Sequence, residues 1–272
     1  MSLPVIDKKS TVPKEEKEII PKKWETEELI PPALRNAIQS KILTPEKKAG
    51  VVYRASVTLM ERLFEDPNAE NIKEAKSGIA DVVDFVIKND KVADSMLKIT
   101  SHDFYTYTHS VNVGILSVIL AKKLLKGSDS HNMIELGAGF FLHDIGKVRV
   151  DAAVINKKGK LTNEEFENMK KHTSHGCEIL SETNQLSEEC RIIVMQHHER
   201  YDGTGYPLGL KYDEINIYGK ICSIADVYDA LTGERSYRKQ LRPFEALKLM
   251  KEQMINHFQK EIFEKFVLLF SN

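Results

Sequence analysis

Apolar residues recur along most of this 272-residue chain at the three- and four-residue spacing of an α-helix. One such stripe runs from Val51 to Leu63, with Thr44 and Pro45 as a helix start and Pro67 as its end. The sequence contains no convincing run of period-two alternation, which is the pattern typical of strands. The pattern therefore predicts an all-α protein with helices over residues 44–66, 71–87, 90–99, 104–126, 132–143, 163–181, 188–198, 217–232, 243–257 and 260–270.

The polar segments predict three regions. Residues 1–30 alternate Lys and Glu clusters with three prolines, which is typical of a flexible, charged arm. Residues 31–100 form an N-terminal helical region that we expect to serve as a scaffold or a dimer interface, and residues 101–272 carry the candidate chemistry. The Lys- and Gly-rich stretch from Val154 to Leu161 predicts a turn and at most a small hairpin.

Composition excludes several classes of protein. With 39 Lys and Arg against 40 Asp and Glu, the net charge is −1, so no general field favours DNA or an anionic membrane. Apolar stretches such as 113–121 are far shorter than the roughly 20 residues that span a bilayer, and the chain does not start with a signal-peptide pattern. Its three cysteines lack CxxC spacing, which predicts free thiols and a cytoplasmic location.

Histidines and aspartates form the most unusual pattern. A His143–Asp144 pair and a His197–His198 pair end two predicted helices, and Asp226 interrupts an apolar helix. Burial of these groups is costly unless they are paired or bind metal, so adjacent pairs are hard to explain as packing. Adding the helix-borne His109 and His172 gives a candidate set of five histidines and two aspartates: His109, His143, Asp144, His172, His197, His198 and Asp226.

Imidazole nitrogens and carboxylate oxygens together suit Fe, Mn, Zn or Ni rather than Mg or Ca. Seven ligands are too many for one catalytic metal and about right for two ions that share a bridging carboxylate, an arrangement suited to phosphoester hydrolysis. A lone helix-face histidine is more often a core or surface residue than a ligand. We therefore interpret the remaining four histidines as structural: His102, His131, His175 and His257.

Three strings resemble the HD-GYP family of bacterial signalling phosphodiesterases. They are HDIGK at 143–147, HHE at 197–199 and DGTGYP at 202–207, and they occur in the family's order. DFYTYTHSVNV at 103–113, KKGKLT at 157–162 and ADVYDALT at 225–232 support the resemblance. It implies an HD-type helical bundle with an N-terminal helical extension, acting as a metal-dependent hydrolase of cyclic di-GMP that yields pGpG and, with further hydrolysis, GMP.

The resemblance also implies roles for individual residues. The seven candidate ligands correspond to the family's metal ligands, with Asp144 bridging two metals. We expect His109, His143 and Asp226 on one metal and His172, His197 and His198 on the other. A metal-bridging hydroxide would be the nucleophile, and Lys147 would stabilise the scissile phosphate. Iron is the expected metal, with Mn, Ni and Zn as alternatives.

Further residues are implied in substrate binding, namely Asp103, Lys147, Gly205, Tyr206, Arg235 and Arg238. The sequence departs from the family twice: Ser236 replaces a proline in the segment that contains both arginines, and Tyr105 replaces a glutamate that some members use for a third metal. Two metals are therefore expected.

Two alternatives remain open at the level of sequence. One is a sensor of cyclic dinucleotides, or a docking module for a diguanylate cyclase or other signalling protein through the GYP loop, with little turnover. The other is the same chemistry on a different cyclic nucleotide. The N-terminal helices also make a homodimer a reasonable expectation.

Overall fold

The computed structural model describes residues 28–100, 106–126, 130–157, 159–233 and 240–271. Within these ranges the chain is helical and contains no strand, as the apolar pattern predicts. In chain order the α-helices are α1 (Pro32–Gln39), α2 (Pro45–Glu65), α3 (Ala69–Lys88), α4 (Asp90–Ile99), α5 (Thr106–Leu124), α6 (Met133–Leu142), α7 (Ala152–Ile155), α8 (Asn163–Lys170), α9 (His172–Glu182), α10 (Glu188–Gln196), α11 (Ile217–Thr232), α12 (Pro243–Gln253) and α13 (Lys260–Val267). Short 3₁₀ turns add η1 (Ile145–Arg149), η2 (Tyr212–Glu214), η3 (Ile255–His257) and η4 (Leu268–Phe270).

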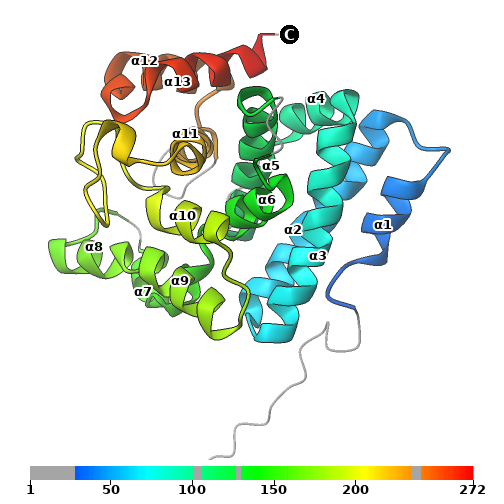
Figure 1. Cartoon of the computed structure of the whole chain (residues 1–272), viewed down its shortest axis with the longest axis horizontal. Helices are drawn as coiled ribbons and strands as arrows, with labels where there is room; N and C mark the ends of the chain where they lie inside the picture. Colours follow the sequence, from blue (N-terminus) through cyan, green and yellow to red (C-terminus); the bar gives the residue numbers. More distant parts are fainter. Residues whose placement is uncertain (1–27, 101–105, 127–129, 158, 234–239, 272) are drawn as a thin grey trace, which may run out of the picture.

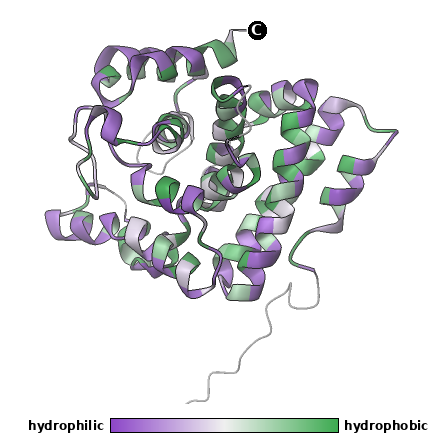
Figure 2. Ribbon diagram, in the orientation of Figure 1, coloured by the Kyte–Doolittle hydropathy of each residue, from purple (hydrophilic) through white to green (hydrophobic). Residues whose placement is uncertain are grey.

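Helices α5 and α6 pack against each other in the middle of the molecule (Figure 1). On one side α2 and α3 cover them, and on the other α10 packs against α6 and α11 against α5. Apolar side chains of α1 to α6 and α9 to α13 form one continuous core, and Figure 2 shows the apolar faces turned inward. The N-terminal helices therefore share the core of the region that carries the candidate chemistry.

Local signals explain most helix starts. The side chains of Thr44, Asn68 and Asn132 accept hydrogen bonds from backbone N–H groups in the first turns of α2, α3 and α6. Thr162 and Glu165 form a capping box at the start of α8. These caps satisfy N–H groups that the helix itself leaves unpaired.

The structure corrects several element predictions. The helix expected over 163–181 is two helices, because the α-helical bonding is interrupted at Lys171, which ends α8, and α9 starts at His172. The short helices α1 and α7 were not predicted, and α12 ends at Gln253 rather than at residue 257. Leu29 and Ile30 are buried in the core, so the last two residues of the predicted 1–30 arm belong to the packed region.

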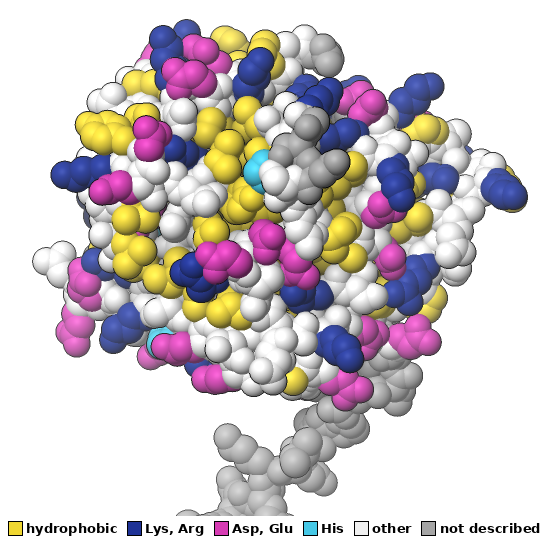
Figure 3. Space-filling view, in the orientation of Figure 1, with side chains coloured by type: hydrophobic (Ala, Val, Ile, Leu, Met, Phe, Trp, Pro, Cys, Tyr) yellow, Lys and Arg dark blue, Asp and Glu magenta, His cyan; other side chains and the backbone are white. Residues whose placement is uncertain are grey.

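The surface agrees with the balanced composition. On the face in Figure 3, basic and acidic side chains are interspersed. None of the described helices is both long and apolar enough to cross a bilayer. The three cysteines, Cys177, Cys190 and Cys222, are free thiols.

Candidate metal centre

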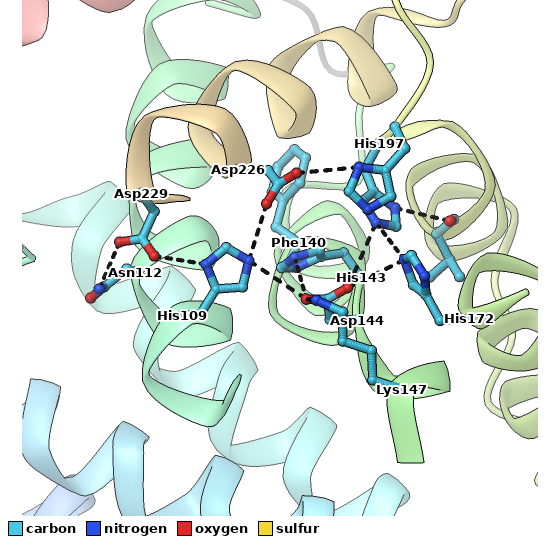
Figure 4. A network of polar contacts seen from close by, with 12 residues as sticks. His109, Asn112, Phe140, His143, Asp144, Lys147, His172, His197, Asp226 and Asp229 are labelled. Atoms are coloured by element: carbon cyan, nitrogen blue, oxygen red, sulfur yellow. Dashed lines mark hydrogen bonds and ion pairs between the residues drawn. The ribbon is translucent and has the colours of Figure 1, made fainter. Parts of the chain in front are cut away.

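All seven predicted ligands meet in one buried cluster between α5, α6, α9, α10 and α11 (Figure 4). Six of them are buried, and only His198 is partly exposed. The cluster joins residues from 109 to 226, so it exists only in the folded chain. We call it the His/Asp cluster.

Asp144 is at the centre of the cluster because of how α6 ends. Helix α6 is buried from Leu136 to Leu142, and His143 and Asp144 follow directly before the 3₁₀ turn η1. Gly146 in that turn lies against the first turn of α9, where an added Cβ would lie 1.9 Å from the carbonyl oxygen of His172. Only glycine permits this approach, which brings His172 to Asp144.

One half of the cluster contains His109 and His143, and we call it the first half. The Nε2 atoms of His109 and of His143 each lie 3.5 Å from Oδ2 of Asp144. His109 Nε2 is also 3.1 Å from Oδ1 of Asp226. Side chains from α5 and the end of α6 thus converge on one oxygen of Asp144, and Asp226 of α11 joins them through His109.

The second half contains His172, His197 and His198. The Nε2 atoms of His172 and His197 lie 3.4 Å and 3.8 Å from Oδ1 of Asp144 and 3.2 Å from each other. His198 completes a group in which one ligand atom from each of these three histidines and Asp144 lies within 4.8 Å of the others.

Two carboxylates connect the halves. Asp144 presents Oδ2 to the first half and Oδ1 to the second, which is the geometry that a bridging ligand requires. Asp226 also faces both halves, because its Oδ2 is 3.4 Å from Nδ1 of His198 while its Oδ1 faces His109. The expected division of histidines matches this grouping, whereas Asp226 is not confined to the first half.

Hydrogen bonds on the far side of each ring fix which nitrogen faces the cluster. Nδ1–H of His143, His172 and His197 donates to the backbone carbonyls of Phe140 (2.8 Å), Met169 (2.7 Å) and Val194 (2.9 Å). Because a carbonyl can only accept, each of these rings carries a hydrogen on Nδ1, and the neutral form of the ring directs an Nε2 lone pair inward.

Those inward lone pairs lack donors. His143 Nε2 and Asp144 Oδ1 are buried without a hydrogen-bond partner, and two Nε2 lone pairs, of His172 and His197, face each other at 3.2 Å. Buried acceptors that converge without a donor are unfavourable unless a cation lies between them. The donor set, imidazole nitrogen with carboxylate oxygen, therefore fits transition-metal ions at both halves.

The direction in which the pKa is shifted differs among the histidines of the cluster. Burial lowers the pKa of His172 to about 4 and that of His198 to about 3, and it lowers the pKa of His197 well below its usual value. Burial acts on His109 in the same direction, but hydrogen bonds to Asp226 and Asp229 outweigh it and raise the pKa of His109 to about 9.

The two carboxylates remain ionised. Burial alone would raise the pKa of Asp144 and Asp226. For Asp144 the neighbouring Lys147 and His143 outweigh burial, and for Asp226 the hydrogen bond to His109 does so; the pKa of each carboxyl is lowered as a result. Deprotonated carboxylates and neutral imidazoles are the protonation states in which these groups bind metal.

Lys147 lies at the open edge of the cluster. Its Nζ forms an ion pair with Oδ2 of Asp144, and 22% of its side chain is exposed. The ammonium group thus reaches the shared carboxylate while remaining accessible to a bound ligand. Its position in η1, three residues after Asp144, explains the spacing in the HDIGK string.

A buried glutamate shapes the GYP loop. Glu199, only 1% exposed, accepts backbone hydrogen bonds from Leu208 (2.7 Å), Gly209 (3.2 Å) and Leu210 (3.0 Å). A Cβ on Gly205 would lie 2.3 Å from the backbone nitrogen of Arg200, so the loop closes tightly only with glycine there. Glu199 was not among the predicted site residues.

Tyr206, which this loop carries, lies over the cluster. Its ring centroid is 4.7 Å from that of His198, with the planes tilted by 32°. Phe166 of α8 approaches the ring of Tyr206 edge-on with a centroid distance of 6.0 Å, and 45% of Phe166 is exposed. Lys170 extends its Nζ over both rings. Tyr206, Phe166 and Lys170 thus form an aromatic and cationic rim.

Some predicted residues cannot be placed. Asp103, Arg235 and Arg238 lie outside the described residues, as do Tyr105, Ser236 and His102. The structural interpretation of the other histidines agrees with their positions, because His131 bonds the hydroxyl of Tyr218 and His175 pairs with Glu178 on the surface. His257 lies in η3, and its carbonyl accepts a bond from the backbone N–H of Tyr201.

Asp229 is a residue of the site that the sequence interpretation missed. Its Oδ2 accepts a 2.7 Å hydrogen bond from Nδ1 of His109, and Asp229 is only 2% exposed. A carboxylate behind a metal-binding histidine fixes the ring and raises its basicity. The sequence feature that could have identified Asp229 is its position one helical turn after Asp226 in the string ADVYDALT.

Comparison with known proteins identifies the family. The family model described as HD domain matches residues 91–262, which is more than half of the chain. The chain belongs to the HD domain family. Its curated relatives include "Cyclic di-GMP phosphodiesterase PA4108" of Pseudomonas aeruginosa, 34% identical over 79% of this chain and 51% of the relative. A "Cyclic di-GMP phosphodiesterase" of Thermotoga maritima is 39% identical over 61% of this chain and 45% of the relative.

The fold of this HD domain protein has a solved counterpart. "Bd1817, a HDG"Y"P protein from Bdellovibrio bacteriovorus" superposes with a TM-score of 0.71 at 20% identity, covering 88% of this chain and 77% of that one. These matches confirm the resemblance to HD-GYP proteins and the all-α HD bundle. The chain spans about half the length of the curated relatives named above.

Proposed function

We propose that this chain is a metal-dependent phosphodiesterase that hydrolyses cyclic di-GMP to pGpG, with GMP as the product of any further hydrolysis. The observation that carries the proposal is the convergence of buried acceptors without hydrogen-bond donors, namely His143 Nε2, Asp144 Oδ1 and the facing Nε2 atoms of His172 and His197. Metal ions bound there, with iron the first candidate, would supply a hydroxide at neutral pH and polarise the phosphate. The names of the curated relatives favour cyclic di-GMP as the substrate.

Individual residues of the chain would have separate roles in this reaction. Asp144 and Asp226 face both halves, so they would fix the spacing of two ions and remain ionised because of the neighbouring cations and histidines. Lys147 would move from Asp144 to a phosphate oxygen and stabilise the charge that develops there. Tyr206 and Phe166 would offer ring surfaces on which a guanine base stacks.

Arg235 and Arg238 complete the proposed substrate site as phosphate or guanine contacts, together with Asp103 and Gly205. Arginine binds phosphate through two parallel N–H donors, which suits a dinucleotide with two phosphodiester groups. As further partners we propose a diguanylate cyclase docking on the GYP loop and a second copy of this chain, in a cytoplasmic setting.

The direct test is anaerobic purification with metal quantification, followed by chromatography of the products from cyclic di-GMP. The proposal predicts two transition-metal ions per chain and the formation of pGpG, and the chromatography also shows whether pGpG is hydrolysed further to GMP. Binding of the nucleotide without product would instead favour a sensor. Faster turnover of another cyclic dinucleotide in competition would keep the chemistry and replace the substrate.

A further inference from the structure

A line of buried polar groups leads from the His/Asp cluster to the N-terminal helix α2. His109 Nδ1 bonds Oδ2 of Asp229 at 2.7 Å, and the other oxygen of Asp229 accepts a 2.8 Å bond from Nδ2 of Asn112. The Oδ1 of Asn112 in turn accepts a 2.8 Å bond from the hydroxyl of Tyr53. Figure 4 shows the inner part of this line, from His109 to Asn112. Three hydrogen bonds therefore connect α2 to the first half.

Chemistry fixes the direction of every bond in this line. The carboxylate of Asp229 can only accept, so Asn112 must turn its NH₂ group toward it and its carbonyl oxygen away. The Tyr53 hydroxyl then has to donate to that oxygen. Asp229 and Tyr53 therefore favour the same orientation of the Asn112 amide from its two ends. Without the hydroxyl of Tyr53, the bond to Asp229 alone would hold the amide, and its oxygen would be buried without this donor.

Packing alone does not account for these polar groups. Asn112 and Asp229 are each 2% exposed, where an apolar residue would be less costly than an amide and a carboxylate. Helix α2 packs along α5, which holds Tyr53 beside Asn112. Tyr53 also lies outside residues 91–262, the range that the family model matches. The line thus reaches from the matched domain into the N-terminal helical region.

We propose that Tyr53 is a positioning residue for the candidate metal centre, so that helix α2 helps to set the metal affinity of the first half. The inference rests on the metal binding in the proposed function. Tyr53 orients Asn112, Asn112 holds Asp229, and Asp229 holds the ring of His109 with its Nε2 toward the ion site. A displacement of α2 relative to α5 would break the outermost bond and weaken metal binding without touching a ligand.

The test is a calorimetric titration of the metal-free full chain with Mn²⁺, comparing the parent with Tyr53→Phe. We expect one of the two ions to bind about threefold to tenfold more weakly and the other to bind as in the parent. This effect is smaller than the roughly 10- to 100-fold loss typical of a direct outer-shell partner, because Tyr53 acts through two residues. Tyr218→Phe is the matched control, since it removes a 2.7 Å hydroxyl bond to His131, which lies outside the cluster.

A second comparison separates positioning from general destabilisation. In the Asn112→Ala background, Tyr53→Phe should cause no further loss of Mn²⁺ affinity, because the connection is already broken. Thermal unfolding of the metal-free variants should give Tyr53→Phe and Tyr218→Phe similar shifts in Tm. Equal Mn²⁺ affinity of Tyr53→Phe and the parent, or an equal loss in the control, would overturn the inference alone. A parent chain that binds no Mn²⁺ would overturn the proposed metal centre as well.

Discussion

The two halves of the His/Asp cluster differ in the partner of one histidine, His109, since His143 of the first half donates to a backbone carbonyl as two histidines of the second half do. In the first half His109 donates Nδ1–H to the carboxylate of Asp229, whereas in the second half His172 and His197 donate to backbone carbonyls. A charged partner favours the protonated ring, and the pKa of His109 is raised to about 9, while burial lowers that of His172 to about 4. The same ligand type is thus tuned in opposite directions about one shared carboxylate, Asp144.

Removal of the carboxylate of Asp144 should prevent metal binding in both halves. In Asp144→Ala both halves lose a common ligand, so we expect neither ion to be retained and the turnover of cyclic di-GMP to fall to background. Metal quantification and product chromatography measure the two effects. Lys147→Met is the control, because it should retain both ions and lose about 10²- to 10³-fold in kcat. Retention of two ions by Asp144→Ala would contradict the bridging role.

Loss of one histidine should remove the metal ion of its own half and leave the other ion bound. We expect His172→Ala to lose the ion of the second half and His109→Ala the ion of the first, each leaving about one ion per chain, because each ion depends on its own histidines. The measurement is the metal-to-protein ratio after gel filtration. If either variant loses both ions or neither, the two halves do not bind independently.

A weaker and more selective change is Asp229→Asn. It keeps the shape of the side chain but removes the charge behind His109, so we expect the first ion to bind about 10- to 100-fold more weakly and the second to be unaffected. Titration with Mn²⁺ measures both sites. Asp84→Asn, a change of the same kind on the exposed face of α3, should leave both affinities unchanged.

The smallest expected effect is a difference in the number of protons that metal binding releases from the two halves. At about pH 7 His109, with a pKa of about 9, carries a proton that a metal must displace, whereas His172 and His198, with pKa values of about 4 and 3, carry none. Filling the first half should therefore release about one proton and filling the second half none. Calorimetry in buffers of different ionisation enthalpy measures the release. Equal release from both halves would show that the contrast in pKa is wrong.

The sequence predicted the fold well where helices are long and amphipathic. Periodicity placed α2, α3 and α11, and for α2 the predicted start at Thr44 and Pro45 agrees with the apolar stripe. It missed the break at Lys171 because apolar residues continue across it and no proline or glycine marks the turn. The eight-residue α1 and the single-turn α7 are too short for a periodic pattern to be detected.

The candidate site was predictable for a different reason. Adjacent pairs such as His143–Asp144 are costly to bury, so they are conspicuous in the sequence itself, and the resemblance supported the assignment of the isolated His109 and His172. Asp229 and Tyr53 could not be found in this way, because their roles depend on partners 120 and 59 residues away in the chain. Tertiary packing alone brings those partners together. Sequence thus identified the groups that face the cluster, and the structure identified those that hold them.

Anomalous diffraction from crystals of the metal-loaded chain, recorded at the absorption edge of iron or manganese, tests the central claim most directly. The account predicts two anomalous peaks on either side of Asp144, one within bonding distance of His109 and His143 and one within bonding distance of His172, His197 and His198. A single peak, or none within bonding distance of Asp144 in crystals whose protein contains metal, would contradict it.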